Sequence, residues 1–257
     1  MSASEKQKLS VLIITLNEEL HIKSLLNDID FADEIIVIDS YSTDRTVSII
    51  ESFENVKVIQ NQFVNYTEQR NFAIDQAQNS WILFIDADER LTPNLKSEIV
   101  ATINKGNAAS AYLIYRTFMF KNKILHFSGW QTDKIFRLFN KTKCRYDQNR
   151  MVHEKLVVNG SVATLKNKII HFSYTSYEDY KAKMYLYGIL KAKEKQRKGQ
   201  KSSYLLLIFH PIYTFLYQFL IRLGFLDGLK GIVICYLNAY SIFIRYKELN
   251  RITSSRI

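Results

Sequence analysis

The segment WILFIDADERL, residues 81–91, places three carboxylates directly after an apolar run: Asp86, Asp88 and Glu89. The apolar part suits a buried strand, but neighbouring carboxylates repel one another unless a positive group lies between them. Divalent cations such as Mg²⁺ and Mn²⁺ prefer carboxylate oxygens and also bridge to phosphates. If Asp86 and Asp88 face one ligand, the segment predicts a site for a metal–diphosphate unit.

Three other interpretations fit part of this segment. Aspartyl phosphatases also follow a strand with Asp-x-Asp, but they carry Thr or Val two positions later, where this chain has Arg90. An EF-hand loop needs a glycine and a distal glutamate at fixed offsets, and the segment has neither. A plain turn whose acids cap a helix stays open on this motif alone.

The elements that must position these carboxylates alternate between strand and helix from residue 9 to about residue 105. Apolar runs predict strands at residues 9–15, 34–39, 56–60 and 81–86. Helices are predicted to begin near residue 18 and to cover residues 42–53, 65–78 and 92–103, the last with Thr92 as its N-cap and Pro93 as its first residue. Such alternation predicts a parallel sheet.

Three of the predicted strands end in polar, acidic segments. TLNEE follows the first strand, DSYSTD the second and DADER the fourth. One polar strand end is usually a turn or a helix cap. Because ligands of parallel sheets bind at the carboxyl ends of the strands, three such ends favour one composite site.

From residue 110 to residue 172 the pattern changes to short runs that mix apolar and polar residues, as antiparallel strands do. These runs are AYLIYRTFMF, KIFRLF, EKLVV and KIIHF, and MVHEK (151–155) lies among them. Only two cysteines occur, Cys144 and Cys235, far apart in the sequence. They give neither a disulfide framework nor a zinc spacing, which favours a reducing cytosol.

The whole excess of the net charge of +10 lies at the end of the chain. Residues 181–257 hold 14 Lys/Arg against 3 Asp/Glu, whereas residues 1–180 hold 21 against 22. The basic run KAKEKQRKGQK (191–201) precedes two apolar runs at 204–221 and 231–244. This pattern favours an anionic membrane surface over nucleic acid. Helices lying in the interface, a buried helical subdomain and a two-span hairpin all stay open.

TLNEE, DSYSTDRT, QRNFA and DADE, in this order and spacing, resemble the family 2 glycosyltransferases over about residues 9–175. The resemblance implies an α/β fold, the GT-A nucleotide-diphospho-sugar transferase fold, as a catalytic domain at residues 1–175. Residues 176–257 are then expected to form a basic, apolar, helical C-terminal extension that associates with a membrane.

The resemblance also implies roles for single residues. The nucleotide-binding set would be Thr15, Glu18, Asp39, Arg70 and Asp86, with Asp39 reading the uracil edge. Asp88 would hold the catalytic metal, Mg²⁺ or Mn²⁺.

A carboxylate must also take the proton of the attacking hydroxyl. In the family this base often lies in an ED-like motif, which residues 110–172 lack. Glu154, in VHE, is our candidate base and Asp133 is the second. His153 would position Glu154 or contact a phosphate, and Trp130 would stack on a sugar ring; each is equally well explained as an ordinary packed side chain.

A subset of the family resembles the chain over nearly its full length: bacterial lipopolysaccharide core transferases of the β-1,4-glucosyltransferase type. The shared features are TLNEE, the HE segment and LDG..KG at 226–231. The resemblance implies inverting transfer of a hexose from a UDP-sugar to a lipid-linked saccharide, as in synthesis of lipopolysaccharide or a related cell-envelope glycan. The enzyme would lie peripherally on the cytoplasmic face of the bacterial inner membrane.

Two other classes are weighed against this. A nucleotidyltransferase typically opens with a glycine-rich, basic loop after its first strand, and TLNEE is acidic and has no glycine. A catalytically inactive sugar-nucleotide-binding scaffold on membranes would keep the fold and lose the acids, all of which are present.

Overall fold

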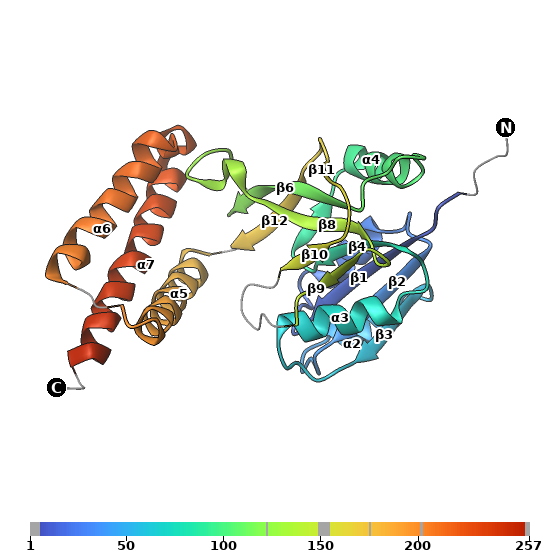
Figure 1. The fold of residues 1–257 in the computed structure, drawn as a ribbon, viewed down its shortest axis with the longest axis horizontal. Coiled ribbons are helices and arrows are strands. Elements are labelled where there is room, and N and C mark those ends of the chain that lie inside the picture. Colours follow the sequence, from blue (N-terminus) through green and yellow to red (C-terminus); the bar gives the residue numbers. More distant parts are fainter. Residues whose placement is uncertain (1–5, 122, 149–154, 175, 201–202, 255–257) are drawn as a thin grey trace. The chain divides into compact units, whose positions relative to one another are not determined.

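The computed structural model describes residues 6–121, 123–148, 155–174, 176–200 and 203–254, which form two compact units (Figure 1). The first unit comprises Met1–Arg116 and Lys134–His171, and the second comprises Thr117–Asp133 and Phe172–Ile257. Residues 117–133, which the sequence placed in the catalytic domain, therefore pack with the C-terminal helices. The expected domain division at residue 175 stays a prediction.

The first unit is built on a parallel sheet of β1 (Leu9–Thr15), β2 (Glu34–Asp39), β3 (Val56–Gln60) and β4 (Trp81–Asp86). Their order in the sheet is β3-β2-β1-β4. All four strands have the bounds that the sequence predicts. Every residue of β1 except Ile14 is buried, because helices cover both faces of the sheet.

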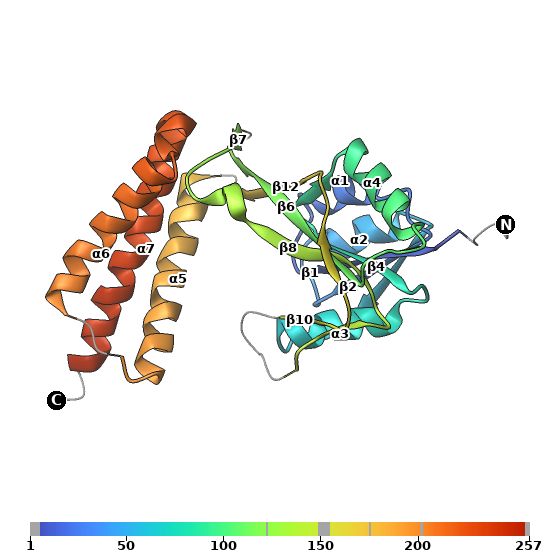
Figure 2. The ribbon, with the colours of Figure 1, turned by 45° about the horizontal axis from the view of Figure 1, so that its top comes forward.

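Helices α1 (Ile22–Asp28), α2 (Thr46–Glu51) and α4 (Pro93–Ile103) pack on one face, and α3 (Tyr66–Gln76) packs on the other (Figure 2). Alternation along the strands sorts the side chains: Val11 and Ile13 of β1 join the core under α1 and α4, whereas Leu12 joins the core under α3. The Thr92 side chain accepts a hydrogen bond from the Leu95 N–H, so the predicted N-cap is confirmed.

Antiparallel strands extend this sheet beyond β4. They are β8 (Lys134–Asn140), which pairs with β4, and β6 (Ala111–Phe120), which pairs with β8 and, in parallel, with β11 (Val162–Thr164). β5 (Glu89–Leu91) pairs antiparallel with β12 (Ile169–Tyr174), and β9 (Cys144–Tyr146) with β10 (Leu156–Val158). β5 was not predicted from the sequence; it begins at Glu89, within the acidic segment DADER.

The second unit contains β7 (Lys123–Leu125), the 3-10 turn η1 (Trp130–Thr132) and the helices α5 (Tyr177–Arg197), α6 (Tyr204–Leu216) and α7 (Gly228–Ser254). A π-helical turn η2 (Tyr217–Ile221) and a 3-10 turn η3 (Gly224–Asp227) connect α6 to α7. Its core gathers Phe118 and Phe120 against Tyr180 of α5 and Leu237 of α7.

Helix α6 has no buried residue among those that the structure describes, although almost all its side chains are apolar. Tyr204 is 81% exposed and Phe209 is 63% exposed. The stretches Tyr204–Ile221 and Gly224–Thr253 are both long and apolar enough to cross a membrane. A contiguous exposed apolar face of this kind marks an interaction surface, so α6 does not fit the buried-subdomain alternative.

Candidate active site

The sheet register brings the polar strand ends together. Thr15, the last residue of β1, pairs with Asp39, the last residue of β2, and Ile14 pairs with Asp86 at the end of β4. Three predicted site residues therefore lie at one edge of the parallel sheet. This is the edge at which such sheets bind ligands.

The loop after β1 is tied to the loop after β2 by side-chain-to-backbone hydrogen bonds. The Asn17 N–H donates to Ser42 Oγ over 2.9 Å, and the Thr43 N–H donates to Asn17 Oδ1 over 2.8 Å. Asn17 has a φ of 56°, a left-handed conformation that asparagine tolerates better than most residues. The Glu18 N–H donates to Thr46 Oγ1 over 2.8 Å, which fixes Glu18 beside the start of α2.

Asp39 is fully buried and accepts hydrogen bonds from both the N–H and the hydroxyl of Ser42. The same Ser42 oxygen accepts from Asn17, so Ser42 couples the Asp39 carboxylate to the loop after β1. Thr15 is 5% exposed, and its hydroxyl oxygen has no hydrogen-bond partner among the described residues. Asp39 and Thr15 thus form a small polar set inside an otherwise apolar sheet edge.

The positive group between Asp86 and Glu89 is an arginine. The Arg137 guanidinium of β8 donates to Asp86 and, over 2.8 Å, to Glu89 Oε1, and all three groups are largely shielded from water. The sequence interpretation considered only a metal–diphosphate unit as the positive group; Arg137 supplies that charge beside Asp86 and Glu89, and the metal at Asp88 stays a prediction. The arginine was missed because β8 lies 48 residues along the chain from Glu89. Its only signal was a charge in the middle of the apolar run KIFRLF.

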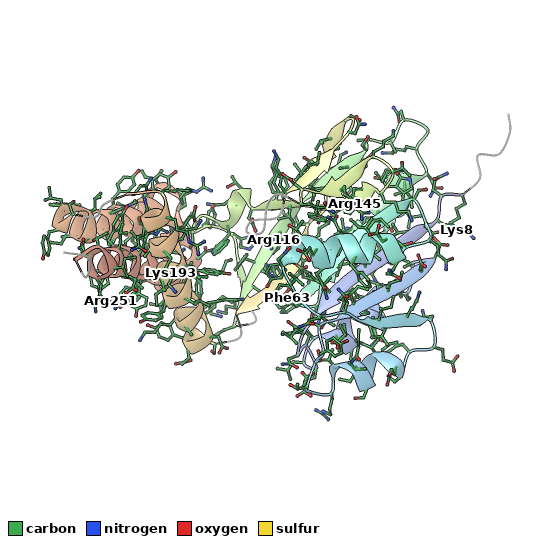
Figure 3. All side chains as sticks on the ribbon, turned by 60° about the horizontal axis from the view of Figure 1, so that its bottom comes forward. Lys8, Phe63, Arg116, Arg145, Lys193 and Arg251 are labelled. Carbon is green, nitrogen blue, oxygen red and sulfur yellow. The ribbon has the colours of Figure 1, made fainter. Side chains whose placement is uncertain are left out.

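The pKa values of the two carboxylates are shifted in opposite directions, although Arg137 lowers both. Burial opposes ionisation of Asp86, but the nearby guanidinium of Arg137, helped by that of Arg70, holds the pKa of Asp86 well below its usual range. Burial raises the pKa of Glu89 above its usual range, against the pull of Arg137. Glu89 also accepts from the Asp86 N–H over 3.1 Å and lies 4.0 Å from Arg116 of β6, which is labelled in Figure 3.

Arg70 of α3 is buried at the same strand end. Its Nη2 donates to Asp86 Oδ1 over 3.1 Å, and its guanidinium lies 4.7 Å from the centre of the Phe84 ring. Its Nη1 also donates to the Tyr146 hydroxyl over 3.3 Å. These contacts make Arg70 a support for the Asp86 carboxylate; its expected role at the base and diphosphate stays a prediction.

Asp88 lies in the tight turn that follows Asp86, and its carboxylate contacts a different partner. Its Oδ2 lies 3.1 Å from Nε2 of His171 on β12. Arg90 fixes the turn that carries Asp88, because it donates to the Ala87 and Glu89 carbonyl oxygens and to that of His21. No role was predicted for His171, whose only signal was its place in the mainly apolar run KIIHF.

Asp88 and His171 fit a divalent cation. Neighbouring ligands of an octahedral ion with bonds of about 2.1 Å lie roughly 3 Å apart, close to the 3.1 Å between these two donor atoms. No cluster of three or more His, Cys, Asp or Glu side chains with metal-binding spacing occurs in the described part of the chain. Such a pair suits a cation that takes its other ligands from phosphates and water, as Mg²⁺ and Mn²⁺ commonly do.

The described structure does not test the two base candidates, Glu154 and Asp133. Glu154 and His153 lie outside the described residues. Asp133 follows η1 and belongs to the second unit. Trp130 lies in the second unit too, with its ring stacked on Phe118 at 3.7 Å between ring centres.

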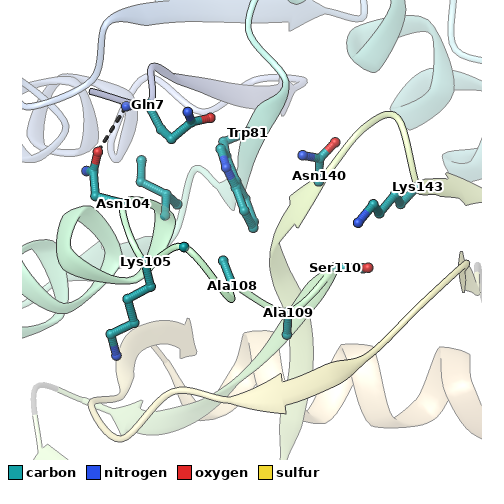
Figure 4. A pocket seen from close by; sticks show the side chains of 11 residues that line it. Gln7, Trp81, Asn104, Lys105, Ala108, Ala109, Ser110, Asn140 and Lys143 are labelled. Atoms are coloured by element: carbon teal, nitrogen blue, oxygen red, sulfur yellow. Dashed lines mark hydrogen bonds between the residues drawn. The ribbon is translucent and has the colours of Figure 1, made fainter. Parts of the chain in front are cut away.

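A pocket of about 280 Å³ in the first unit lies at the other end of the strands (Figure 4). It is lined by Trp81, the first residue of β4, by Gln7, which precedes β1, and by Asn104 after α4, to which the Gln7 N–H donates. Because parallel sheets bind ligands at the carboxyl ends of strands, this pocket is not the candidate site.

Comparisons with known proteins agree on one family. The family described as Glycosyl transferase family 2 matches residues 10–159. A Rickettsia bellii (strain RML369-C) protein described as an uncharacterized glycosyltransferase is 33% identical over 264 residues, which cover 98% of this chain and 90% of that protein. LpsC of Rhizobium meliloti (strain 1021), a lipopolysaccharide core biosynthesis glycosyltransferase, is 27% identical over 258 residues, 94% of each chain.

Solved structures show the same fold. TarS of S. aureus, crystallised in complex with UDP, is similar with a TM-score of 0.51 at 18% identity, over 97% of this chain and 92% of that one. The GT-A fold expected from the sequence is therefore confirmed.

Proposed function

This chain belongs to glycosyl transferase family 2, and from that premise we propose that it moves a hexose from a UDP-sugar to a lipid-linked saccharide with inversion at the anomeric carbon. Membership of this family identifies the protein as a glycosyltransferase and argues against the nucleotidyltransferase alternative. The observation that carries the proposal is the register of β1, β2 and β4, which gathers Thr15, Asp39 and Asp86 at one sheet edge.

The nucleoside is proposed to bind where β1 and β2 end. Asp39 offers a carboxylate that Ser42 holds in a fixed orientation, and a carboxylate is the acceptor that the N–H of a uracil edge requires. The Thr15 hydroxyl lies beside it in the register. Arg70 and Arg137 keep Asp86 ionised, so this carboxylate can accept a hydrogen bond from a ribose hydroxyl.

The diphosphate is proposed to lie beside Asp88 and His171, which would hold Mg²⁺ or Mn²⁺. A divalent cation there neutralises the diphosphate and so makes it a better leaving group. In an inverting transfer the acceptor oxygen attacks the anomeric carbon from the face opposite the diphosphate, and the bond from that carbon to the diphosphate oxygen breaks. The hydroxyl proton passes to a carboxylate, for which Glu154 and Asp133 remain the candidates.

The acceptor is proposed to be a lipid-linked saccharide at the cytoplasmic face of a bacterial inner membrane. Two observations support this. LpsC, which is similar over 94% of this chain, is a lipopolysaccharide core enzyme. Helix α6 exposes a continuous apolar surface next to the basic end of α5, a combination that suits an anionic membrane.

The test is a screen of UDP and UDP-sugars against the purified full chain, with and without Mn²⁺. We expect calorimetry to show UDP binding, and one UDP-sugar to be hydrolysed or transferred faster when Mn²⁺ is present. The anomeric configuration of the product, read by nuclear magnetic resonance, decides between inversion and retention. Binding without turnover of any donor would favour the inactive scaffold, and a retained configuration would contradict inversion.

Two variants locate the nucleotide. Asp39→Asn should weaken UDP binding, because the amide presents a donor as well as an acceptor to the base. Asp75→Asn is the matched control, since Asp75 lies on α3, is 54% exposed and pairs with Arg145, which is labelled in Figure 3. Equal UDP affinities for these two variants would remove Asp39 from the nucleotide site.

A further inference from the structure

A cavity of about 290 Å³ lies inside the second unit. Residues 128–130, helices α5 and α7, the end of α6 and the turn η2 all line it. Its polar side chains include Trp130, Gln218, Asn238, Ser241 and Arg245. These residues are far from one another in the sequence and meet only in the folded unit, so the cavity was not visible as a motif.

Two N–H groups of these side chains are buried without a hydrogen-bond acceptor in the part of the chain that the structure describes. They are Nε1 of Trp130 and Nε of Arg245. The Trp130 ring is held by stacking on Phe118, with 3.7 Å between the ring centres and 15° between the planes. Buried donors are normally paired, so Trp130 and Arg245, whose side chains both belong to the cavity wall, have donor capacity that the described residues do not use.

Several polar groups at this cavity are already bonded within the unit. Gln218 Oε1 accepts from the Asn238 amide over 2.8 Å, and Asn238 Oδ1 accepts from the Tyr180 hydroxyl over 2.8 Å. The Thr214 hydroxyl donates to the His210 carbonyl oxygen over 2.8 Å. The wall also carries the donors of Trp130 and of the Gln218 side-chain amide and the positive charge of Arg245.

A donor-rich cavity with one guanidinium suits an anion that has several oxygens outside one plane. The donors come from three elements, with Trp130 on η1, Gln218 on η2 and Arg245 on α7. A phosphate can meet donors from several directions, whereas the two oxygens of a carboxylate lie in one plane. Arginine also pairs with phosphate through two parallel hydrogen bonds.

The apolar surface beside the cavity indicates where such a phosphate comes from. Helix α6 contributes Thr214 to the cavity wall and exposes Ile208, Ile212 and Tyr213, which are 55%, 51% and 63% exposed. We propose that the cavity binds the terminal phosphate of a membrane-lipid headgroup while α6 lies among the lipids. This site goes beyond glycosyl transfer, whose proposed nucleotide and metal residues lie in the first unit.

The test compares binding of the full chain to two kinds of phosphatidylcholine vesicle, one containing phosphatidic acid and one containing oleic acid at the same surface potential. Both surfaces are anionic, but only phosphatidic acid presents a terminal phosphate. We expect clear preference for phosphatidic acid. Equal binding to both surfaces would show that surface charge is sufficient and would overturn the proposal.

Arg245→Gln should remove that preference, with a loss of about tenfold in affinity for phosphatidic acid vesicles and little change for oleic acid vesicles. Lys247→Gln is the matched control, because Lys247 is an exposed cation of the same helix and does not line the cavity. It should weaken binding to both vesicles alike. If the two variants behave in the same way, the cavity does not select phosphate.

Trp130→Phe tests the site without changing a charge. The phenyl ring keeps the stacking on Phe118 and loses only the N–H, so we expect a selective loss of a few-fold for phosphatidic acid vesicles. Melting curves followed by circular dichroism control for folding, and if Arg245→Gln melts early, Trp130→Phe decides the outcome. Glycerol 3-phosphate in solution should compete poorly. Competition as strong as that of the lipid would assign the cavity to a free phosphate and overturn the lipid assignment.

Discussion

Arg137 is a buried cation whose partners, Asp86 and Glu89, are both carboxylates of one short segment. Arg137→Met should lower the free energy of unfolding by about 3 kcal/mol or more at neutral pH, because it leaves the buried Glu89 and the partly buried Asp86 without their counter-charge. Denaturant unfolding of the full chain measures this change. Lys134→Met, an exposed change on the same strand, is the control and should shift it by less than about 0.5 kcal/mol.

The cost of losing Arg137 should also depend on pH. Asp86 has a lowered pKa in the folded protein, so its stabilisation is complete above the ordinary aspartate pKa and is lost as the pH falls towards the folded value. Glu89 has a raised pKa, so its contribution has the opposite sign and is lost as the pH rises through the folded value. Protonation removes the charges that Arg137 balances. The difference between Arg137→Met and the native chain should therefore shrink on acidification; a constant difference would contradict this account.

Asp88 and His171 are proposed to hold the same cation from two different strands. Asp88→Asn should lower turnover by about a hundredfold or more, because a positive charge is no longer held at the diphosphate. His171→Gln should weaken Mn²⁺ binding and leave UDP binding without metal nearly unchanged. Paramagnetic resonance of bound Mn²⁺ reads the metal directly and separately from activity. Normal Mn²⁺ affinity in both variants would place the metal elsewhere.

Two loops at the sheet edge act together because Ser42 links them. Ser42→Ala removes the hydroxyl that donates to Asp39 and accepts from Asn17, so Asp39 loses part of its fixed orientation. UDP affinity should fall by roughly threefold to tenfold, the effect expected for one hydrogen bond. Calorimetry measures this, with Ser48→Ala as the control, since Ser48 is exposed on α2 and its hydroxyl donates to the Arg45 carbonyl oxygen of its own helix start. Equal affinities would show that the link does not matter.

Helices α5 and α7 approach closely at Gly188. A Cβ at this position would lie 2.8 Å from the Ser241 carbonyl oxygen and 2.8 Å from Cγ2 of Ile244. Alanine normally stabilises a helix relative to glycine, but here it must push the helices apart. Gly188→Ala should therefore destabilise the helical unit by about 1–3 kcal/mol.

Hydrogen exchange of the α5 and α7 amides would show whether the stability lost in Gly188→Ala is lost in the second unit. Gly106→Ala is the control, because a Cβ there meets nothing within 4 Å. Its effect on stability should be close to zero or slightly favourable. A Gly188→Ala protein as stable as the control would mean that the helices can separate without loss.

The second unit as a whole is proposed to dock on an anionic membrane without crossing it. Lys193 and Arg197 are exposed on α5 and Lys198 is exposed directly after it; Lys193 is labelled in Figure 3. Neutralising all three should remove about 1 kcal/mol each from binding to anionic vesicles and should reduce its dependence on salt. The remaining, salt-insensitive binding comes from the apolar face of α6, at roughly 25 cal/mol for each Å² removed from water.

A labelling experiment separates docking from crossing. Leu229, in the first turn of α7, is 82% exposed, whereas both native cysteines are buried. A Leu229→Cys protein bound to sealed vesicles should react with an impermeant thiol reagent from the side on which the protein was added. Reaction only from the far side would show a two-span hairpin and end the interfacial proposal.

The sequence by itself determined the strands of the parallel sheet, the fold class and the family. Strands at 9–15, 34–39, 56–60 and 81–86 could be predicted to the residue, because each is a short, mainly apolar run that is followed by polar residues. Asp39 and Asp86 could be placed at one edge for the same reason, since the carboxyl ends of parallel strands meet there. These features depend on local composition and on spacing along the chain.

The charge balance of the site was decided only by the tertiary structure. Arg137 lies 51 residues from Asp86, and His171 lies 83 residues from Asp88, on antiparallel strands that no local pattern pairs with the acids. The cavity lined by Trp130 and Arg245 likewise exists only where a loop and three helices pack together. Which counter-charge meets an acid, and which residues line a cavity, depends on which distant segments pack together. A buried charge needs a partner of opposite sign, but the sequence does not show which residue that partner is.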